Sequence, residues 1–138
     1  MNLKIKKLYT DSKVPSFAHS YDAGMDLFSV EDVFVKGGDI VKIKTGVAFE
    51  IEDGYVGLIW DKSSVGSRGL KTLGGVIDSG YRGEVIVVMK NLGEDYEFKK
   101  GDKIAQILIQ KVEHPNIEEV NELSSTVRGE GGFGSTGK

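Results

Sequence analysis

Residues 41–52, Val-Lys-Ile-Lys-Thr-Gly-Val-Ala-Phe-Glu-Ile-Glu, place apolar and charged side chains in near alternation. A β-strand turns successive side chains to opposite faces, so this pattern predicts a strand with one buried face. Residues 3–8 repeat the pattern, with lysines between Leu3, Ile5 and Leu8. We expect both stretches to be half-buried strands.

Four shorter runs are rich in β-branched or apolar residues and predict more deeply buried strands: residues 33–35, 55–60, 84–90 and 103–112. Turn signals containing glycine bound these runs. No window keeps helical periodicity over three turns, and the one short helix we expect lies near residues 63–66. Many short strands between turns predict an all-β fold: a sandwich, a jelly roll or a small barrel.

Length and composition narrow the class of protein. The chain has 138 residues, which allows one domain at roughly 150 residues per domain. Its 18 lysines and arginines against 21 acids leave a net charge of −3, so we expect no nucleic-acid partner. The sequence lacks cysteine and shows no signal-peptide or membrane-spanning run. We therefore expect a cytoplasmic protein with no membrane partner.

Residues 128–138 contain five glycines in eleven positions and cannot form a packed element alone. The same residues include Arg128, Phe133, Ser135 and Thr136, which could make charged, stacking and hydroxyl contacts to a nucleotide. The stretch also resembles the start of a phosphate loop, but no Ser or Thr and no helix follow its lysine. We therefore exclude a Walker-type triphosphatase. From the residues alone, the stretch is either a frayed flexible terminus, which is the usual case for a glycine-rich tail, or a tail that orders only on binding.

Five segments occur in a characteristic order: Ala-Gly-Met-Asp-Leu (23–27), Asp-Lys-Ser-Ser-Val (61–65), Gly-Val-Ile-Asp-Ser-Gly-Tyr-Arg-Gly-Glu (75–84), Gly-Asp-Lys-Ile-Ala-Gln-Ile (101–107) and Arg-Gly-Glu-Gly-Gly-Phe-Gly-Ser-Thr-Gly (128–137). Together they resemble the five motifs of the trimeric dUTP diphosphatase (dUTPase) family. Any one segment alone would be weak evidence, whereas five in register are hard to produce by chance.

The resemblance implies a jelly-roll-like β domain at residues 1–127 and a mobile C-terminal arm at residues 128–138. It also implies a homotrimer in which each active site is built from three chains and closed by an arm. The implied reaction is hydrolysis of dUTP to dUMP and pyrophosphate. This reaction limits uracil incorporation into DNA and supplies dUMP for dTMP synthesis.

In the third motif, Asp78 matches the family's catalytic aspartate, which activates a water for attack on the α-phosphorus. Without the motif, an aspartate in this sequence would be an ordinary turn residue. Tyr81 matches the tyrosine that packs on the deoxyribose and leaves no room for a 2′-hydroxyl. Backbone groups of Val76 and Ile77, on a β-hairpin expected around residues 73–77, match the positions that read uracil.

The phosphate side of the site is implied by the first, second and fourth motifs. Asp26 matches the acid that holds Mg²⁺ through water, and Mg²⁺ is the expected cofactor. Lys62, Ser63 and Ser64 match positions that contact the phosphates. Gln106 matches a residue near the phosphates and the metal's waters.

The arm of the fifth motif closes the site. Arg128 matches the clamp on the terminal phosphate, and Phe133 matches the lid over uracil. Gly134, Ser135 and Thr136 match further phosphate contacts. An arm that closes over bound nucleotide would exclude water from the reacting phosphate.

The chain departs from the usual motifs in the second motif and near the base. Many members of the family have Pro-Arg-Ser-Gly where this chain has Asp61-Lys62-Ser63-Ser64, so a point-charge ammonium replaces a planar guanidinium. Many members also carry an asparagine that helps to read uracil six residues before the catalytic aspartate. That position is Thr72 here, so we expect backbone groups to read the base instead.

Two alternatives remain open at this point. A dCTP deaminase shares the fold and the triphosphate-binding logic, but its second motif is rich in Ala-Arg, which this chain lacks. A regulatory protein could retain nucleotide binding without turnover. Against this reading, Asp78, Asp26, Gln106 and Arg128 are all present.

Overall fold

The computed structural model describes residues 1–137 of the chain. These residues form short strands and one helical turn, and the all-β prediction is confirmed. The elements are β1 (Lys4–Lys7), β2 (Met25–Phe28), β3 (Val33–Val35), β4 (Ile40–Glu50), β5 (Tyr55–Trp60), α1 (Ser63–Gly66), β6 (Leu70–Leu73), β7 (Val76–Ile77), β8 (Glu84–Asn91), β9 (Tyr96–Phe98) and β10 (Lys103–Lys111). The expected helix at residues 63–66 is therefore present.

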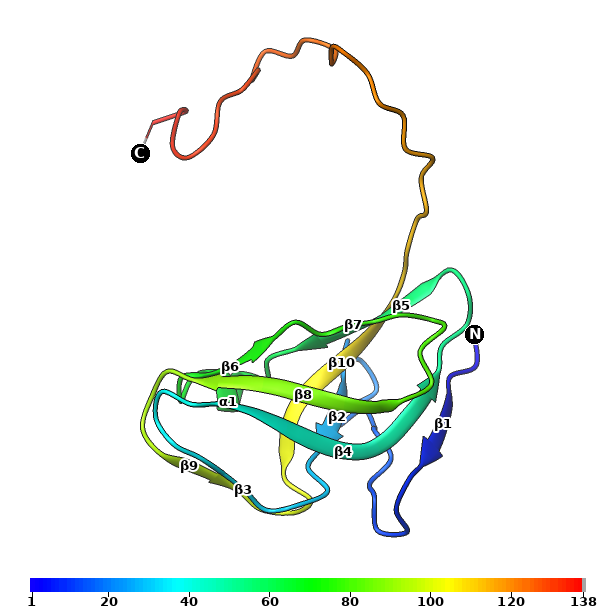
Figure 1. Cartoon of the computed structure of the whole chain (residues 1–138), viewed down its shortest axis with the longest axis vertical. Coiled ribbons are helices and arrows are strands. Elements are labelled where there is room, and N and C mark those ends of the chain that lie inside the picture. Colours follow the sequence, from blue (N-terminus) through cyan, green and yellow to red (C-terminus); the bar gives the residue numbers. More distant parts are fainter. Residues whose placement is uncertain (138) are drawn as a thin grey trace.

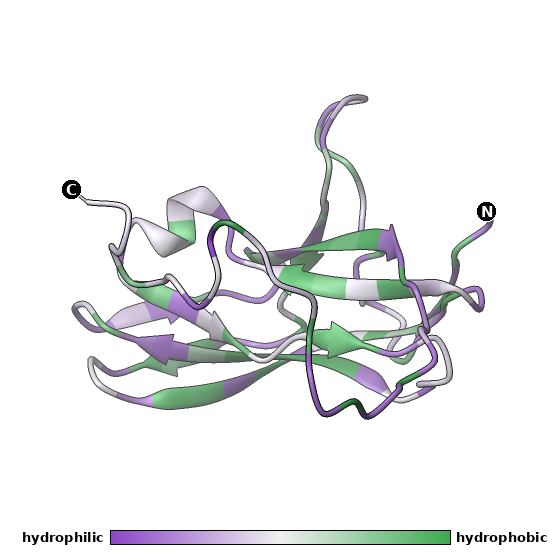
Figure 2. Ribbon diagram, turned by 90° about the horizontal axis from the view of Figure 1, so that it is seen from above, coloured by the Kyte–Doolittle hydropathy of each residue, from purple (hydrophilic) through white to green (hydrophobic). Residues whose placement is uncertain are grey.

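The strands form two four-stranded antiparallel sheets and a small ribbon (Figure 1). The first sheet has the order β1-β4-β8-β6, and the second has the order β2-β10-β5-β7. Strands β3 and β9 form the ribbon. Seen from above, the strands lie in layers with hydrophobic positions recurring along them (Figure 2). This is the jelly-roll-like arrangement that the motifs implied.

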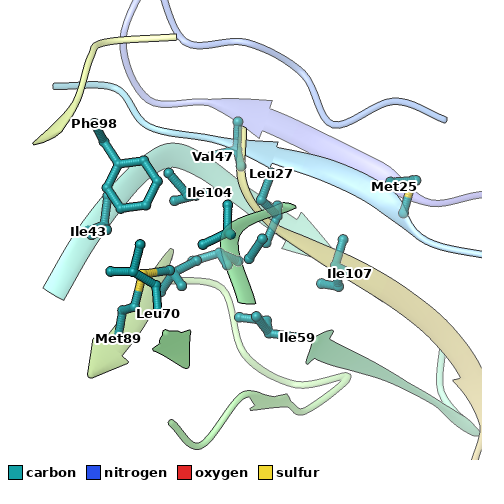
Figure 3. Close-up of a cluster of buried hydrophobic side chains, with 14 of the residues drawn as sticks. Met25, Leu27, Ile43, Val47, Ile59, Leu70, Met89, Phe98, Ile104 and Ile107 are labelled. Carbon is teal, nitrogen blue, oxygen red and sulfur yellow. The ribbon is translucent and has the colours of Figure 1, made fainter. Parts of the chain in front are cut away.

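One hydrophobic core lies between the two sheets (Figure 3). Ile43 and Met89 reach it from the first sheet, and Leu27 and Ile107 reach it from the second. All four side chains are essentially inaccessible to water. Apolar side chains from both inner faces interdigitate in this way in sandwich folds. The core therefore holds the strands of the second sheet in the register on which the site depends.

Four strands were not predicted from the sequence, namely β2, β6, β7 and β9. Each has four residues or fewer, which is too short for alternation to be a reliable signal. Long-range pairing with β10, β8, β5 and β3 makes them strands. They matter for function because three of them contain or adjoin the implied site residues.

The expected β-hairpin around residues 73–77 is wrong. Strand β6 pairs with β8 in the first sheet, whereas β7 pairs with β5 in the second sheet. The chain thus crosses between the sheets through Gly74 and Gly75, which have φ angles of 70° and 106°. Both strands lie at sheet edges, so each has one row of backbone groups outside the ladders.

Beyond β10 the chain leaves the sheets in a long arc (Figure 1). Residues 113–137 contain no strand or helix and are almost entirely exposed. Turns recur toward its end, including one in which the Arg128 carbonyl accepts a hydrogen bond from the Gly131 N–H at 3.1 Å. In residues 1–137, no helix has the length and apolar character needed to cross a membrane.

Candidate active site

Three residues lie in one row across the second sheet. Gln106 on β10 pairs with Asp26 on β2 and with Trp60 on β5. Directly paired residues share a face, and the residues on either side of Asp26 and of Gln106 are buried in the core. The alternation that buries the apolar neighbours therefore brings Asp26 of the first motif and Gln106 of the fourth motif together on the outer face. Asp61, the first residue of the second motif, directly follows Trp60.

Asp26 is a buried carboxylate between two ammonium groups. Its side-chain oxygens lie 3.0 Å from Lys62 Nζ and 2.6 Å from Lys103 Nζ, and the residue is only 5% exposed. Burial alone raises the pKa of Asp26, but the hydrogen bonds from Lys103 and Lys62 outweigh it and hold the pKa below its ordinary value. The three side chains carry a net positive charge, which suits a polyphosphate ligand.

Lys103 is a site residue that the sequence analysis missed. In a regular strand it would face away from Gln106, three positions on. A bulge intervenes, because Lys103 pairs with Phe28 while Ala105 pairs with the adjacent Leu27. Bulges re-aim side chains in this way. Only the pairing of β10 with β2 could reveal that Lys103 reaches Asp26.

A hollow of about 350 Å³, here called the Asp26 hollow, lies beside this row of residues. Gly24 is needed here, because a Cβ at this position would lie 3.1 Å from Gln106 Cβ and would collide with the Gln106 amide oxygen. Gln106 Nε2 donates to the backbone oxygen of Asp61 at 2.8 Å. The hollow is lined by Asp22, Ala23, Gly24, Asp26, Lys62, Ser63, Ser64 and Gln106.

The protein groups at this hollow offer few direct ligands to magnesium, so most of the ligands of a bound ion would be water and phosphate oxygens. In residues 1–137, no group of three or more histidine, aspartate or glutamate side chains is placed to ligate an ion. Both Asp26 oxygens already contact lysines, which leaves their second lone pairs for water. The side-chain oxygen of Gln106 lies beside Gly24 at the same hollow. This donor set fits a hydrated Mg²⁺ that is also bound by phosphate oxygens.

A second and separate hollow of about 180 Å³, here called the Tyr81 hollow, is lined by Val76, Ile77, Asp78, Tyr81, Glu84 and Ile86. The Asp78 carbonyl accepts from the Tyr81 N–H at 3.1 Å, which closes a turn at the end of β7. Tyr81 Oη donates to the Glu84 carbonyl at 2.9 Å. A Cβ on Gly83 would lie 2.6 Å from Tyr81 Cζ, so this glycine leaves room for the ring.

Thr72 lies outside both hollows. It is 7% exposed, and its hydroxyl donates to Asp61 Oδ1 at 2.8 Å. Its backbone N–H donates to the same oxygen at 2.7 Å. Two of the residues at which this chain departs from the usual motifs, Asp61 and Thr72, therefore contact each other. Asp61 is a second residue of interest that sequence reasoning did not single out.

Apart from Thr72, the implied site residues fall into three groups on one chain. Asp26, Lys62, Ser63, Ser64 and Gln106 meet at the Asp26 hollow. Val76, Ile77, Asp78 and Tyr81 meet at the Tyr81 hollow. The arm residues Arg128, Phe133, Gly134, Ser135 and Thr136 are exposed and belong to the segment that leaves the sheets (Figure 1).

Comparison with known proteins places this architecture in a family. The dUTPase family model matches residues 10–137. A deoxyuridine 5'-triphosphate nucleotidohydrolase of Nautilia profundicola is 48% identical over 142 residues and covers 100% of both chains. A protein of the same name from Clostridioides difficile is 44% identical, covering 99% of this chain and 98% of its own.

Comparison with solved structures also indicates the dUTPase family. A mutant dUTPase of Staphylococcus bacteriophage 80alpha with dUpNHpp superposes with a TM-score of 0.94 at 33% identity, covering 99% of each chain. A mutant dUTPase from phage phi11 of S. aureus, whose structure is described as showing the coordination of a structural Mg(II) ion, superposes with a TM-score of 0.83 at 30% identity. That match covers 88% of this chain and 98% of the phage chain. With family model, relatives and fold in agreement, the chain belongs to the dUTPase family.

Proposed function

We propose that this chain hydrolyses dUTP to dUMP and pyrophosphate, with Mg²⁺, at active sites shared by three copies. The observation that carries the proposal is the pair of hollows in a dUTPase-family fold. One hollow brings the Lys62 ammonium and the hydroxyls of Ser63 and Ser64 together beside Asp26 and Gln106, and the other joins an exposed carboxylate to an aromatic ring. The first suits a triphosphate, and the second suits a deoxynucleoside and an attacking water.

Asp78 is proposed as the general base. Its carboxylate is exposed, and within residues 1–137 no lysine or arginine lies in ion-pair contact with it. An unpaired carboxylate can accept a proton from a water that it orients. In the proposed reaction this water attacks the α-phosphorus, the bond to the bridging oxygen breaks, and pyrophosphate leaves.

The leaving pyrophosphate would be stabilised at the Asp26 hollow. Lys62 and the exposed hydroxyls of Ser63 and Ser64 face the space that the phosphates would fill. Asp26 and Gln106 would accept hydrogen bonds from the waters of Mg²⁺. The metal, when bound, supplies positive charge for the oxygens that become more negative as pyrophosphate leaves.

Selectivity for deoxyribose would depend on Tyr81. Its hydroxyl is tied to the Glu84 carbonyl and its ring lies close to Gly83, so the ring has little freedom to move away from a bound sugar. A ribose 2′-hydroxyl would have to displace the ring. A preorganised side chain of this kind discriminates by steric exclusion.

The trimer explains why the two hollows are separate on one chain. Neither hollow contains both the phosphate contacts and the proposed base. A site assembled from copies would join the Tyr81 hollow of one protomer to the Asp26 hollow of a second protomer. The arm, which extends away from its own sheets (Figure 1), would close that site with Arg128 and Phe133.

Pyrophosphate release from dUTP, dCTP, dTTP and UTP, measured with Mg²⁺ and with excess chelator, tests the proposal. We expect selective cleavage of dUTP that the chelator suppresses. Release of ammonia from dCTP would instead indicate a deaminase. Binding of dUTP without turnover would indicate a regulatory protein.

A further inference from the structure

We infer that Asp61 is a specificity-determining positioning residue, which acts through Thr72 to set the segment that reads the base. The inference rests on the proposed function, because it concerns how the same site would select uracil. The motif pattern assigns no role to Asp61, since the usual residue there is proline. It emerges from four contacts, all made by one residue.

The side chain of Asp61 holds strand β6. Its Oδ1 accepts from both the N–H and the hydroxyl of Thr72, at 2.7 and 2.8 Å. Its Oδ2 accepts from Lys71 Nζ at 2.6 Å. Burial raises the pKa of Asp61, but hydrogen bonds from Lys71 and Thr72 outweigh it and keep the pKa below its ordinary value. The carboxylate therefore remains charged and accepts all three bonds at neutral pH.

The backbone of Asp61 holds the other side of the site. Its carbonyl accepts from Gln106 Nε2, and the next three residues, Lys62 to Ser64, line the Asp26 hollow. One residue thus joins the phosphate-binding loop to the edge strand that leads into the crossing at Gly74 and Gly75. The contact spans the two sheets, because β5 precedes Asp61 in the second sheet and β6 belongs to the first.

The Thr72 contact bears on base reading because β6 lies at the edge of its sheet. An outward N–H on an edge strand is a ready hydrogen-bond donor. At Thr72 this donor is occupied by Asp61, so a base could use only the groups further along the crossing. The same bond sets the distance between β6 and the segment Lys62–Ser64, which lines the Asp26 hollow. Hydrogen-bond readout of a base depends on such spacing, and a misplacement of about 1 Å can cost roughly 100-fold in rate.

The Lys71 ion pair is not the important part of this arrangement. The Lys71 side chain is 51% exposed, and exposed ion pairs contribute little. The Thr72 contacts are partly buried and charge-assisted, which makes them the stronger restraint. Lys71 therefore offers a matched control: its removal takes away one Asp61 contact and leaves both Thr72 contacts in place.

The experiment compares kcat/KM and calorimetric affinity for dUTP, dCTP and dTTP in a set of variants. Asp61→Ala removes both contacts to Thr72, and Thr72→Val removes only the hydroxyl contact, because the backbone N–H still donates to Asp61. Asp61→Asn and Thr72→Ser retain the oxygen or the hydroxyl. Lys71→Met is the control. We expect the dUTP preference to fall about 10-fold in Asp61→Ala and by less in Thr72→Val, and the double variant should lose no more than Asp61→Ala alone. The conservative variants and the control should keep the preference.

Equal losses for all three nucleotides, or additive losses in the double variant, would overturn the inference and leave Asp61 a purely structural residue. Melting temperatures measured in parallel separate unfolding from a change in selectivity. Failure of the proposed function would look different. The unmodified chain would then not cleave dUTP, and the affinity ratios among the three nucleotides would still test the role of Asp61.

Discussion

The ion pairs that Asp26 forms with Lys62 and Lys103 stabilise the fold, and this stabilisation is lost in acid. Asp26 is almost completely buried, so its charge is tolerated only because Lys62 and Lys103 lie within 3.0 and 2.6 Å. Its pKa is lowered in the folded chain. The stabilisation by the Asp26 charge is therefore fully present above pH 4, roughly the pKa of an aspartate in the unfolded chain. It is lost as the pH falls through the lower pKa that Asp26 has in the folded chain.

Replacing Lys103 tests this contribution. We expect Lys103→Met to reduce the free energy of unfolding at pH 7 by about 1 kcal/mol, a small value because the Lys103 side chain is 43% exposed. The difference from the unmodified chain should shrink as the pH is lowered below about 4. Urea unfolding at fixed protein concentration measures it. Lys4→Met, which removes an exposed ion pair with Glu50, is the control, and an equal loss in both variants would refute the argument.

Asp78 gives the sharpest prediction for catalysis. Because its side chain is exposed, Asp78→Asn should leave the fold and dUTP affinity intact. Loss of a general base commonly costs 10²- to 10⁴-fold, and we expect kcat to fall by about that factor. Pyrophosphate release and calorimetry with dUTP measure the two quantities. Undiminished turnover would exclude Asp78 as the base.

The crossing between β6 and β7 depends on two glycines that differ in their surroundings. A Cβ on Gly75 would lie 2.9 Å from Ile59 Cβ, whereas one on Gly74 would meet open space. Both have positive φ. We expect Gly75→Ala to lower the free energy of unfolding by about 2 kcal/mol, and Gly74→Ala by about 1 kcal/mol. Urea titration distinguishes them, and equal effects would show that crowding by Ile59 is unimportant.

The arm is an element whose removal should spare the fold. Residues 128–137 lie outside both sheets and outside the core, so truncation after Val127 should leave the melting temperature nearly unchanged. If the arm closes the site, kcat/KM should fall by at least about 100-fold, because water exclusion and phosphate contacts are lost. Circular dichroism and pyrophosphate release measure the two effects. A truncated chain with normal turnover would rule out the lid role.

At the scale of the whole molecule, the separation of the two hollows predicts complementation between defective chains. Chains with Asp78→Asn and chains truncated after Val127 should each be nearly inactive alone. If base and arm in one site come from different protomers, mixed trimers contain some complete sites, and co-refolding should restore activity well above either parent. Sedimentation equilibrium verifies the trimer, and an inactive mixture of confirmed hetero-trimers would contradict shared sites.

By itself the sequence determined the class of fold and the family. Alternation in β4 and apolar runs in β5, β8 and β10 are local consequences of strand geometry, and the structure confirms them. Glycines in the motifs lie where another part of the chain comes close to the backbone, as the Gln106 side chain does at Gly24. The short strands β2, β6 and β7 escaped prediction, because two to four residues acquire strand geometry only from a partner distant in sequence.

Only the tertiary structure decided which charged and polar groups meet. A bulge that turns Lys103 toward Asp26, and a contact between sheets that joins Asp61 to Thr72, leave no periodic trace in the chain. The division of the site residues between two hollows is likewise a product of sheet order. Periodicity records which face a side chain takes, whereas the partner it meets depends on register and on how the sheets pack.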